Sequence, residues 1–252
     1  YLAEGATLSG FTIQNGFAAA EIESITTNQT GIEEYVFVDG SMPNFGGGVR
    51  AAGLTAVVTN CVFIGNRVNG DGGGFYGGSA FNCMFISNTA QSATGGANVD
   101  DPVARGGAAG NATLRDCSML WNSCPHGGAV YGGRAIQCAI ISNSATFQGG
   151  GALNTQAEGC EFAWNSAWDG GGQHGGTALR CTFASNGASR GAGACNADLL
   201  YCRLTGNSAF DSGGGSYSGG SSGCVFTANY AVNGGGAWAG THIQSTFARN
   251  KG

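Results

Sequence analysis

Cysteine is the residue type whose number and spacing first suggest chemistry in this chain. The 252 residues include ten cysteines, and thiols can form disulfides, bind zinc or act as nucleophiles. Eight of them recur in one frame, at intervals of 21 or 22 residues with a single interval of 34, and no Cys-x2-Cys pair occurs. The missing pairs exclude a zinc site of that type, and the regular period is typical of a solenoid. The eight are Cys61, Cys83, Cys117, Cys138, Cys160, Cys181, Cys202 and Cys224.

An asparagine follows each of these cysteines five residues later, in the pattern Cys-x-apolar-x-x-Asn. We expect its side chain to point inward, where the amide donates to one neighbouring coil and accepts from another in a stacked ladder. The alternative is a surface turn, where Asn is tolerated because it adopts left-handed backbone geometry. A weaker first coil reads Leu8, Phe11, Ile13 and Asn15, and the last coil has Ser245 in place of cysteine. The ladder asparagines are Asn66, Asn88, Asn122, Asn143, Asn165, Asn186, Asn207, Asn229 and Asn250.

A cluster of glycines begins eleven residues before each cysteine from Cys83 onward, as at Gly170 before Cys181. Such clusters fit a corner with positive φ or a close contact between backbones. Apart from extra residues just before Cys61, length varies between the ladder asparagine and these glycines, so this joint is predicted to be the loop of each coil. Two insertions enter there, at about residues 17–45 and 89–105.

Alternating apolar residues around each cysteine predict a β-strand with one face inward. The cysteine and the residues two before and two after it are mostly apolar or small, as in Ile136, Cys138 and Ile140, and the residues between them are mostly polar. One such strand per coil, in constant phase, stacks in parallel on the strand of the next coil. The sequence therefore predicts an all-β fold, with one domain over residues 1–252 formed by a single-stranded parallel β-helix of about ten coils of 21–22 residues.

The same stacking disfavours disulfides between ladder cysteines. Neighbouring coils hold Cα atoms about 4.8 Å apart with parallel Cβ vectors, whereas a disulfide prefers Cβ atoms about 3.8 Å apart. We expect mostly free, buried thiols that act as small apolar residues. Cys124 and Cys195 lie outside the ladder, and the sequence leaves their redox state open.

A column of mostly large residues stands four positions after the first glycine of each cluster. We expect it to pack in the core or at its edge, and the alternative is a platform for stacking sugars. His174 belongs to this column, whereas His126 and His242 fall in other columns and coils, so no three-histidine metal site is predicted. The column comprises Tyr76, Gly110, Tyr131, Leu153, His174, Cys195, Tyr217 and Trp238.

The motifs Gly-Gly-Gly, Cys-x-Phe-x-x-Asn and Asn-x-Ala, with the opening segment LSGFTIQNG at residues 8–16, resemble right-handed parallel β-helix proteins of the pectate-lyase-like superfamily. The closest resemblance is to the repeats of polymorphic outer-membrane proteins, which carry Gly-Gly-Ala-Ile and Phe-x-x-Asn motifs in bacterial surface passenger domains. The resemblance covers nearly the whole chain and implies a right-handed coil. Members include adhesins, autotransporter passengers and polysaccharide-degrading enzymes, so the resemblance is specific for fold and not for function.

The acidic residues do not form the constellation that the enzymes of this superfamily use. The resemblance implies an Asp cluster that binds calcium and an Arg or Lys base in a lyase, and two or three facing Asp carboxylates in a hydrolase. Here Asp100 and Asp101 lie in the second insertion, and Asp116, Glu158 and Glu161 belong to different coils. We therefore expect no catalytic residues, metal or cofactor. A β-helix enzyme that binds or degrades polysaccharide is the alternative.

The amino-acid composition limits the kinds of partner that the chain could bind. Charged residues make up 10% of the chain, Lys occurs once, at Lys251, and the net charge is −5, which excludes nucleic-acid binding through a basic face. No apolar run reaches the ~18 residues of a membrane span. The remaining class is a structural or interaction protein.

The sequence thus predicts a non-catalytic β-helix outside the cell or on its surface, with bacterial secretion. It would act as an adhesive stalk or passenger, or as a self-assembling filament subunit. The sequons at Asn28 and Asn111 are compatible with glycosylation outside the cell. The two insertions are candidate contacts for a glycan or host-surface ligand. Because residues 2–13 are strand-like and the chain stops in mid-coil without a capping helix pattern, either further coils or head-to-tail self-association are expected at the ends.

Overall fold

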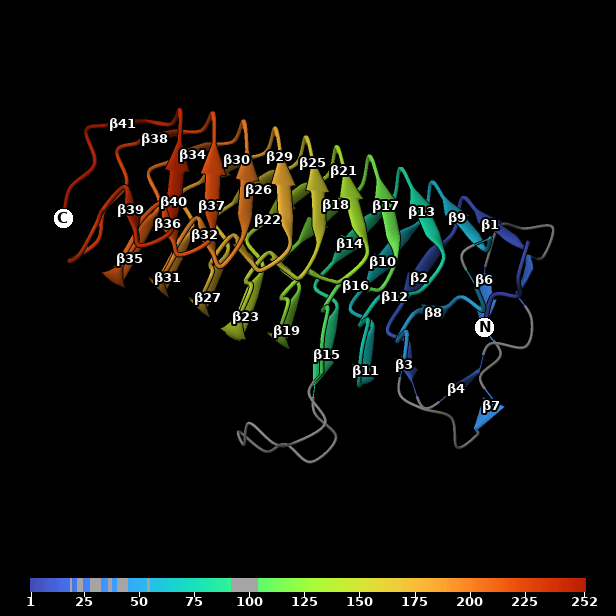
Figure 1. Ribbon diagram of the computed structural model, residues 1–252. Helices are drawn as coiled ribbons and strands as arrows, with labels where there is room; N and C mark the ends of the chain where they lie inside the picture. Colours follow the sequence, from blue (N-terminus) through green and yellow to red (C-terminus); the bar gives the residue numbers. More distant parts are fainter. Residues whose placement is uncertain are drawn as a thin grey trace.

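The computed structural model describes residues 1–18, 45–53, 55–91 and 104–252, together with the backbone of four short strands between residues 20 and 39. The secondary structure of this part of the chain consists of strands, with no helix. The strands stack along one axis as a parallel β-solenoid, and the two chain ends lie at opposite ends of the stack (Figure 1). The predicted fold class is confirmed.

Each full coil passes through four parallel sheets, here numbered I to IV in chain order. Sheet I contains β1 (Thr7–Ser9), β9 (Val57–Thr59), β13 (Ser79–Phe81), β17 (Thr113–Arg115), β21 (Arg134–Ile136), β25 (Gln156–Glu158), β29 (Thr177–Leu179), β33 (Asp198–Leu200), β37 (Gly220–Ser222) and β40 (Thr241–Ile243). Sheet II contains β2 (Thr12–Gln14), β10 (Val62–Ile64), β14 (Met84–Ile86), β18 (Ser118–Leu120), β22 (Ala139–Ile141), β26 (Glu161–Ala163), β30 (Thr182–Ala184), β34 (Arg203–Thr205), β38 (Val225–Thr227) and β41 (Thr246–Ala248).

The other two sheets are shorter. Sheet III contains β3 (Phe17–Ala18), β11 (Arg67–Asn69), β15 (Thr89–Gln91), β19 (Ser123–His126), β23 (Ser144–Gln148), β27 (Ser166–Asp169), β31 (Gly187–Arg190) and β35 (Ser208–Ser212). Sheet IV contains β8 (Val49–Arg50), β12 (Phe75–Tyr76), β16 (Ala109–Gly110), β20 (Val130–Tyr131), β24 (Ala152–Leu153), β28 (Gln173–His174), β32 (Ala194–Cys195), β36 (Ser216–Tyr217) and β39 (Ala237–Trp238). Outside the solenoid, β4 (Ala20–Glu21) pairs antiparallel with β7 (Val38–Asp39), and β5 (Ile25–Thr27) pairs antiparallel with β6 (Glu33–Tyr35).

The number of coils is slightly lower than predicted. Sheets I and II have ten strands each, but sheet IV has nine and sheet III has eight, so about eight turns carry all four faces. In the coil after Asn229 the chain forms only isolated bridges in place of a sheet III strand, at Tyr230 and Asn233. The prediction of about ten coils therefore fits sheets I and II alone.

A left-handed residue before each cysteine corrects the predicted strand phase. Gln137, with φ of 52°, separates β21 from β22, so two strands in different sheets replace the single strand expected across Cys138. The inward residue of sheet I is consequently three positions before the cysteine, as at Ala135, whereas the residue two positions before varies in burial. Ile136 is buried, but Leu200 is exposed, as is Ile243 in the coil that has Ser245 in place of cysteine.

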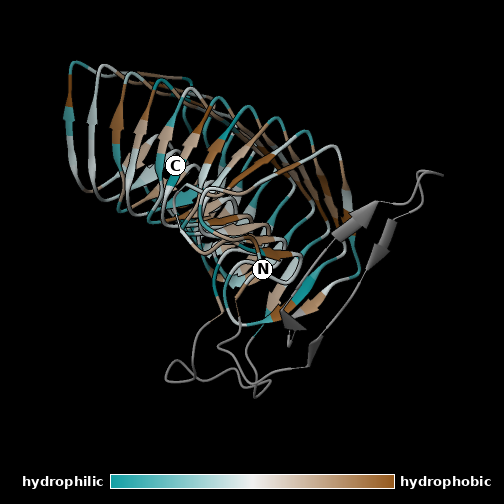
Figure 2. Ribbon diagram, turned by 90° about the vertical axis from the view of Figure 1, so that its right-hand side faces the viewer, coloured by the Kyte–Doolittle hydropathy of each residue, from teal (hydrophilic) through white to brown (hydrophobic). Residues whose placement is uncertain are grey.

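The cross-section of each coil has two lobes with separate cores. The major lobe holds stacked phenylalanines, with ring centroids 4.6 Å apart for Phe63 and Phe85 and 4.7 Å apart for Phe162 and Phe183. The minor lobe runs in each coil from the ladder asparagine to the glycine cluster, and its separate small clusters consist mostly of alanine, as in Ala209. Seen from the N-terminal end, successive coils repeat this outline along the axis (Figure 2).

Glycines form the narrow waist between the two lobes. A Cβ atom on Gly171 would lie 2.4 Å from the carbonyl oxygen of Gly187 and 2.7 Å from that of Ala192. The preceding Gly170 turns the chain with φ of +67°. Both roles proposed for the glycine cluster, positive φ and close backbone contact, are therefore present, on neighbouring residues.

Candidate functional site

The asparagine ladder runs along the waist, and its hydrogen bonds connect consecutive coils. Asn165 Nδ2 donates to Ile140 O at 2.8 Å in the preceding coil and to Asn186 Oδ1 at 3.1 Å in the next one, and its backbone N–H donates to the same Oδ1 at 2.9 Å. Asn143 donates to Asn165 Oδ1 in the same way, from N at 2.9 Å and from Nδ2 at 3.0 Å. The eight asparagines from Asn66 to Asn229 are buried. The predicted inward ladder is confirmed.

The first coil corrects one assignment. Ile13 pairs with Phe63, which places Gly16, and not Asn15, opposite Asn66. Gly16 N donates to Asn66 Oδ1 at 2.9 Å, and Asn15 occupies the left-handed turn before it with φ of 54°. The ladder therefore begins at Asn66 and extends to Asn250, which accepts from Asn229 Nδ2 at 3.0 Å.

The cysteine ladder lies in the major lobe, between sheets I and II. The eight ladder thiols are free and buried, as expected, and Cys124 and Cys195, which the sequence left open, are free and buried too. Cys160 Sγ donates to Ala135 O at 3.2 Å in the neighbouring coil and accepts the backbone N–H of Cys138 at 3.4 Å. Outside the ladder, burial raises the pKa of the Cys195 thiol to about 12 and also raises the pKa of Cys124. These two thiols therefore stay protonated near neutral pH and are poor nucleophiles.

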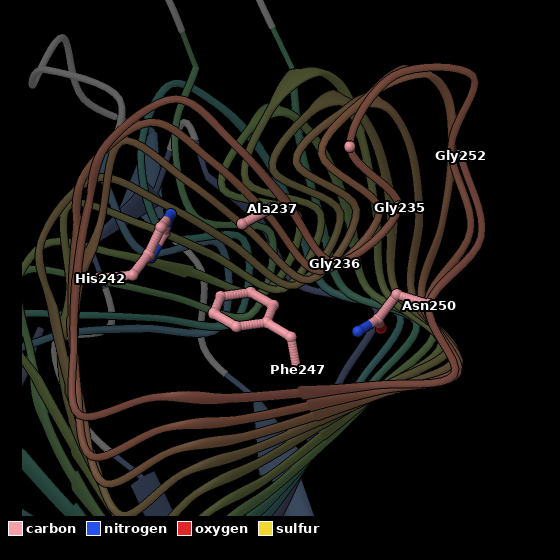
Figure 3. A pocket seen from close by; sticks show the side chains of 8 residues that line it. Gly235, Gly236, Ala237, His242, Phe247, Asn250 and Gly252 are labelled. Carbon is pink, nitrogen blue, oxygen red and sulfur yellow. The ribbon is translucent and has the colours of Figure 1, made fainter.

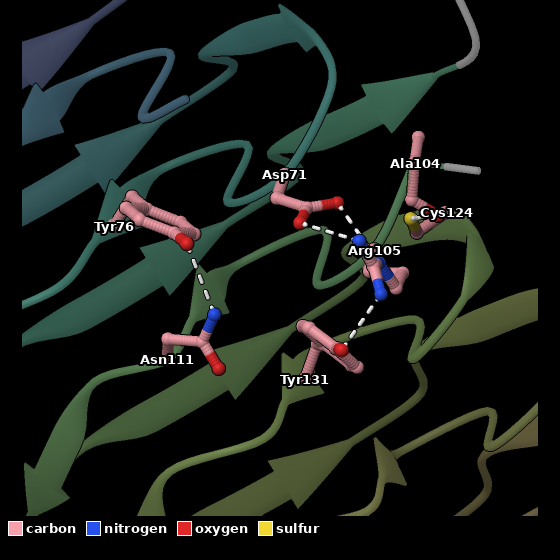
Figure 4. Close-up of polar contacts among 7 residues, drawn as sticks. All are labelled: Asp71, Tyr76, Ala104, Arg105, Asn111, Cys124 and Tyr131. Carbon is pink, nitrogen blue, oxygen red and sulfur yellow. Dashed lines mark hydrogen bonds and ion pairs between the residues drawn. The ribbon is translucent and has the colours of Figure 1, made fainter. Parts of the chain in front are cut away.

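An ion pair between a buried aspartate and a partly exposed arginine clamps the minor lobe to sheet IV (Figure 4). Arg105 Nη2 lies 3.3 Å from Asp71 Oδ2 in the coil before, and Arg105 Nη1 donates to the hydroxyl of Tyr131 at 2.7 Å in the coil after. The guanidinium also lies 4.4 Å from the centroid of the Tyr131 ring. Burial raises the pKa of Asp71, and the charge of Arg105 opposes that shift.

The same clamp recurs four coils further along. Arg190 donates to Asp169 from Nε at 2.8 Å and from Nη2 at 2.6 Å, and its guanidinium lies 5.3 Å from the centroid of the Tyr217 ring. The column that includes Tyr131 and Tyr217 thus packs at the edge of the solenoid, as expected. Each clamp joins three consecutive coils, which is a structural role.

The histidines and acidic residues do not converge. His174 is half-buried, and burial lowers its pKa, whereas His126 stacks on Phe147 at 5.1 Å between centroids and His242 shares a hydrogen bond of 2.8 Å with Ser221. In the part of the chain that the structure describes, no group of three or more His, Cys, Asp or Glu residues is arranged to hold a metal ion.

The acidic residues singled out from the sequence occupy different columns. Asp116 lies in the turn before Cys117, Glu158 ends β25 and Glu161 begins β26. Glu158 lines a shallow hollow of about 400 Å³ over Gly159, together with Arg115 and Arg180. Asp100 and Asp101 lie outside the described residues.

Of the two sequon asparagines, Asn111 lies among the described residues and Asn28 does not. Asn111 is exposed at the corner between sheets IV and I, with φ of 48°, and its Nδ2 donates to the hydroxyl of Tyr76 at 3.0 Å (Figure 4). Asn28 lies outside the described residues, as do most of the two insertions. The glycan or ligand contacts predicted for these insertions therefore remain predictions.

Exposed tryptophan is the feature that sequence reasoning missed. Trp121 and Trp164 are 62% and 66% exposed, and both lie in the turn between sheets II and III, directly before a ladder asparagine. Their position in the repeat, four residues after Cys117 and Cys160, would have placed them in one column.

The last coil leaves its cross-section open. A hollow of about 430 Å³ is lined by the glycines of the waist and by His242, Phe247 and Asn250, and Phe247 is 45% exposed. Figure 3 shows Phe247 and His242 pointing into the major lobe and the waist narrowing between Gly236 and Asn250. In every earlier coil the equivalent surface is covered by the coil that follows it.

No helix among the described residues has the length and apolar character needed to span a membrane.

Comparisons with known proteins leave the family open. No protein-family model matches the chain, no curated protein matches its sequence, and no solved structure matches its fold. The resemblance to pectate-lyase-like β-helices and to polymorphic outer-membrane-protein repeats thus depends on the sequence motifs, and the structure shows a parallel β-solenoid.

Proposed function

We propose that this chain is a non-catalytic structural β-helix of an extracellular or cell-surface protein, which acts as a stalk or passenger segment or assembles end to end. The observation that carries the proposal is the unbroken asparagine ladder, because each coil from Asn66 to Asn250 is bonded to the next by the same amide contacts. Such stacking favours an extended and rigid rod, and the ten strands of sheets I and II span about 50 Å.

The uniform contact between coils supports the self-association form of this proposal. Asn229 N donates to Asn250 Oδ1 at 3.0 Å, and every ladder asparagine before it makes the equivalent bond. Because one set of contacts serves every pair of coils, the same contacts would pair a coil of a second copy, and a head-to-tail contact of that kind extends into a filament.

The resemblance to bacterial surface passengers supports a location outside the cell, with secretion from a bacterium. Sedimentation velocity and negative-stain microscopy over a wide concentration range test the architecture. Rods of about 50 Å, or multiples of that length, are expected. Compact particles would overturn the proposal.

Catalysis is tested separately with the purified chain and a panel of acidic and neutral polysaccharides. No new reducing ends or unsaturated sugars are expected. Cleavage that is lost in the Asp100→Ala or Asp101→Ala variant would show that the second insertion holds an active site, and the enzyme alternative would then replace the structural one.

A further inference from the structure

We propose that Trp121 and Trp164 form a platform on which a neutral, extended β-1,4-linked glycan stacks, with its chain parallel to the solenoid axis. This inference goes beyond the structural role and does not depend on it. It starts from an unusual placement, because tryptophan is highly buried on average in folded proteins. Both indoles here are more than half exposed.

The backbone register places the two tryptophans two coils apart in one column. Trp121 N donates to Ile141 O, Ser142 N to Ala163 O, and Trp164 N to Ala184 O. These equivalent bonds show that Trp121, Ser142 and Trp164 occupy the same turn in three consecutive coils. Since coils stack at about 4.8 Å, the two tryptophan Cα atoms are about 10 Å apart.

The turn also aligns the two side chains. Trp121, Ser142 and Trp164 have nearly identical left-handed φ angles of 55°, 57° and 58°. Their Cα–Cβ bonds therefore point outward in the same direction. Ser142 is small, so the space between the two indoles is not filled by a third ring.

Neither indole is used within the fold. In the described part of the chain, no hydrogen bond, ion pair or ring contact involves the side chain of Trp121 or Trp164. An exposed indole offers an apolar face for stacking and one N–H donor. That combination matches a pyranose ring, which has apolar C–H faces and hydroxyls around its edge.

The spacing and charge favour one class of glycan. In an extended β-1,4-linked chain, each sugar is rotated by about half a turn relative to the one before it. The same face is therefore presented by every second sugar. The distance between those two sugars is close to the distance between the two tryptophans, which are two coils apart. The remaining positions of the turn column are uncharged apart from Arg249 at the far end. They are Asn15, Gly65, Ser87, Ser142, Ser185, Gly206 and Ala228. The nearest acidic side chain in the chain sequence, Glu161, would repel an anionic glycan.

A second aromatic pair shows the same interval on the neighbouring sheet. Ala167, Ala188 and Ala209 are in register in sheet III, and Trp168 and Phe210 directly follow the first and the last of them. Trp168 is 63% exposed and Phe210 is 83% exposed. The register shifts directly after Ala209, so Trp168 and Phe210 lie about two coils apart without being in strict register.

Binding of cellohexaose, followed by tryptophan fluorescence and by calorimetry, tests the proposal. Trp121→Ala and Trp164→Ala are each expected to weaken binding by roughly tenfold or more, because each removes one stacked ring. Tyr201→Ala is the matched control, since Tyr201 is 63% exposed in a left-handed turn with φ of 53° but lies at a different corner. Its affinity is expected to be unchanged. Maltohexaose and polygalacturonate are expected to bind at least tenfold more weakly than cellohexaose.

A swap variant tests the spacing itself. Trp164→Ser combined with Ser185→Trp keeps two tryptophans in the column but moves them three coils apart, and it is expected to bind as weakly as Trp164→Ala. Full affinity in the swap variant, or equal affinity for all three glycans, would overturn the proposal. So would a change of sedimentation coefficient in Trp121→Ala without a change in glycan binding, because the platform would then be a contact between copies. Cleavage of bound cellohexaose would contradict the structural role and leave the binding proposal standing.

Discussion

The major and minor lobes of the solenoid come from the same repeat, yet they tolerate change very differently. The major lobe has a continuous core of stacked phenylalanine, aliphatic residues and cysteine, whereas the minor lobe has separate clusters made mostly of alanine. Both insertions follow a strand of sheet III, in the minor lobe: one comes after β3 and the other after β15. A thin core has little packing to lose when the chain leaves it, so the minor lobe is where this repeat can be extended.

The waist explains how the two lobes coexist in every coil. On one side the asparagine amides bond coil to coil, and on the other the glycine backbone passes within contact distance of the opposite chain, as at Gly171. Changes in the minor lobe therefore do not reach the phenylalanine stack. The comparison predicts that stability is concentrated in the major lobe and the waist.

The largest effect is expected in the major lobe. Phe183→Ala should lower the free energy of unfolding by about 3–5 kcal/mol, because it removes a fully buried ring from the stack and leaves a cavity. Ala209→Gly in the minor lobe is the control and should cost no more than about 1 kcal/mol. Denaturant unfolding measures both. Equal costs would contradict the division of stability between the lobes.

At the waist, Gly171→Ala should destabilise the fold by roughly 1–3 kcal/mol or more, since the added methyl group meets backbone oxygens that cannot move independently. Gly187→Ala is a matched control in the minor lobe, where an added Cβ has nothing within 4 Å. It should be neutral or stabilising by up to about 1 kcal/mol. If both variants unfold at the same denaturant concentration, the waist is not a close contact.

A substitution in the asparagine ladder, on the other side of the waist, is expected to cost a similar amount of stability. Asn165→Ala should cost roughly 1–3 kcal/mol, because the donors of Asn143 and the acceptors Ile140 O and Asn186 Oδ1 lose their buried partner. Asn154→Gly, at an exposed left-handed position with φ of 51°, should change stability by less than about 0.5 kcal/mol. Similar losses in the two variants would mean that burial of the ladder amide is unimportant.

Periodicity explains which features of the coil could be predicted from the sequence and which could not. The Asn and Cys columns were visible because each needs one residue type at a fixed place in every coil. The turn before each cysteine was harder to see. Asn, Asp or Gly, which favour a left-handed φ, occupy five of its eight positions, but Gln137, Arg180 and Tyr201 interrupt the column with types that do not. The stacked coils impose that conformation, and it shifts the inward phase of sheet I.

The two lobes were hidden for a related reason. Glycine clusters predicted a corner or a close contact, but not which segment of chain would lie opposite. The contact joins Gly171 to Gly187 and Ala192, so it depends on how the whole coil closes. The exposed tryptophans were missed because only two coils carry them in that column, and an interrupted column does not register as a repeat.

The smallest predicted effect concerns pH and the edge of sheet IV, between the lobes. Burial lowers the pKa of His174, with Arg190 acting in the same direction and Asp169 opposing it. The unfolded chain therefore takes up a proton at a higher pH than the folded chain does, and stability rises with pH wherever the unfolded state binds more protons. The contribution of His174 is fully present above about pH 6.5, the value for an unperturbed histidine, and is lost as the pH falls through its lowered pKa. His174→Leu, which copies Leu153 of the preceding coil, should flatten the dependence of the unfolding free energy on pH below about 6.5. His242→Leu serves as the comparison variant, and an unchanged slope in His174→Leu would mean that this edge is open to solvent.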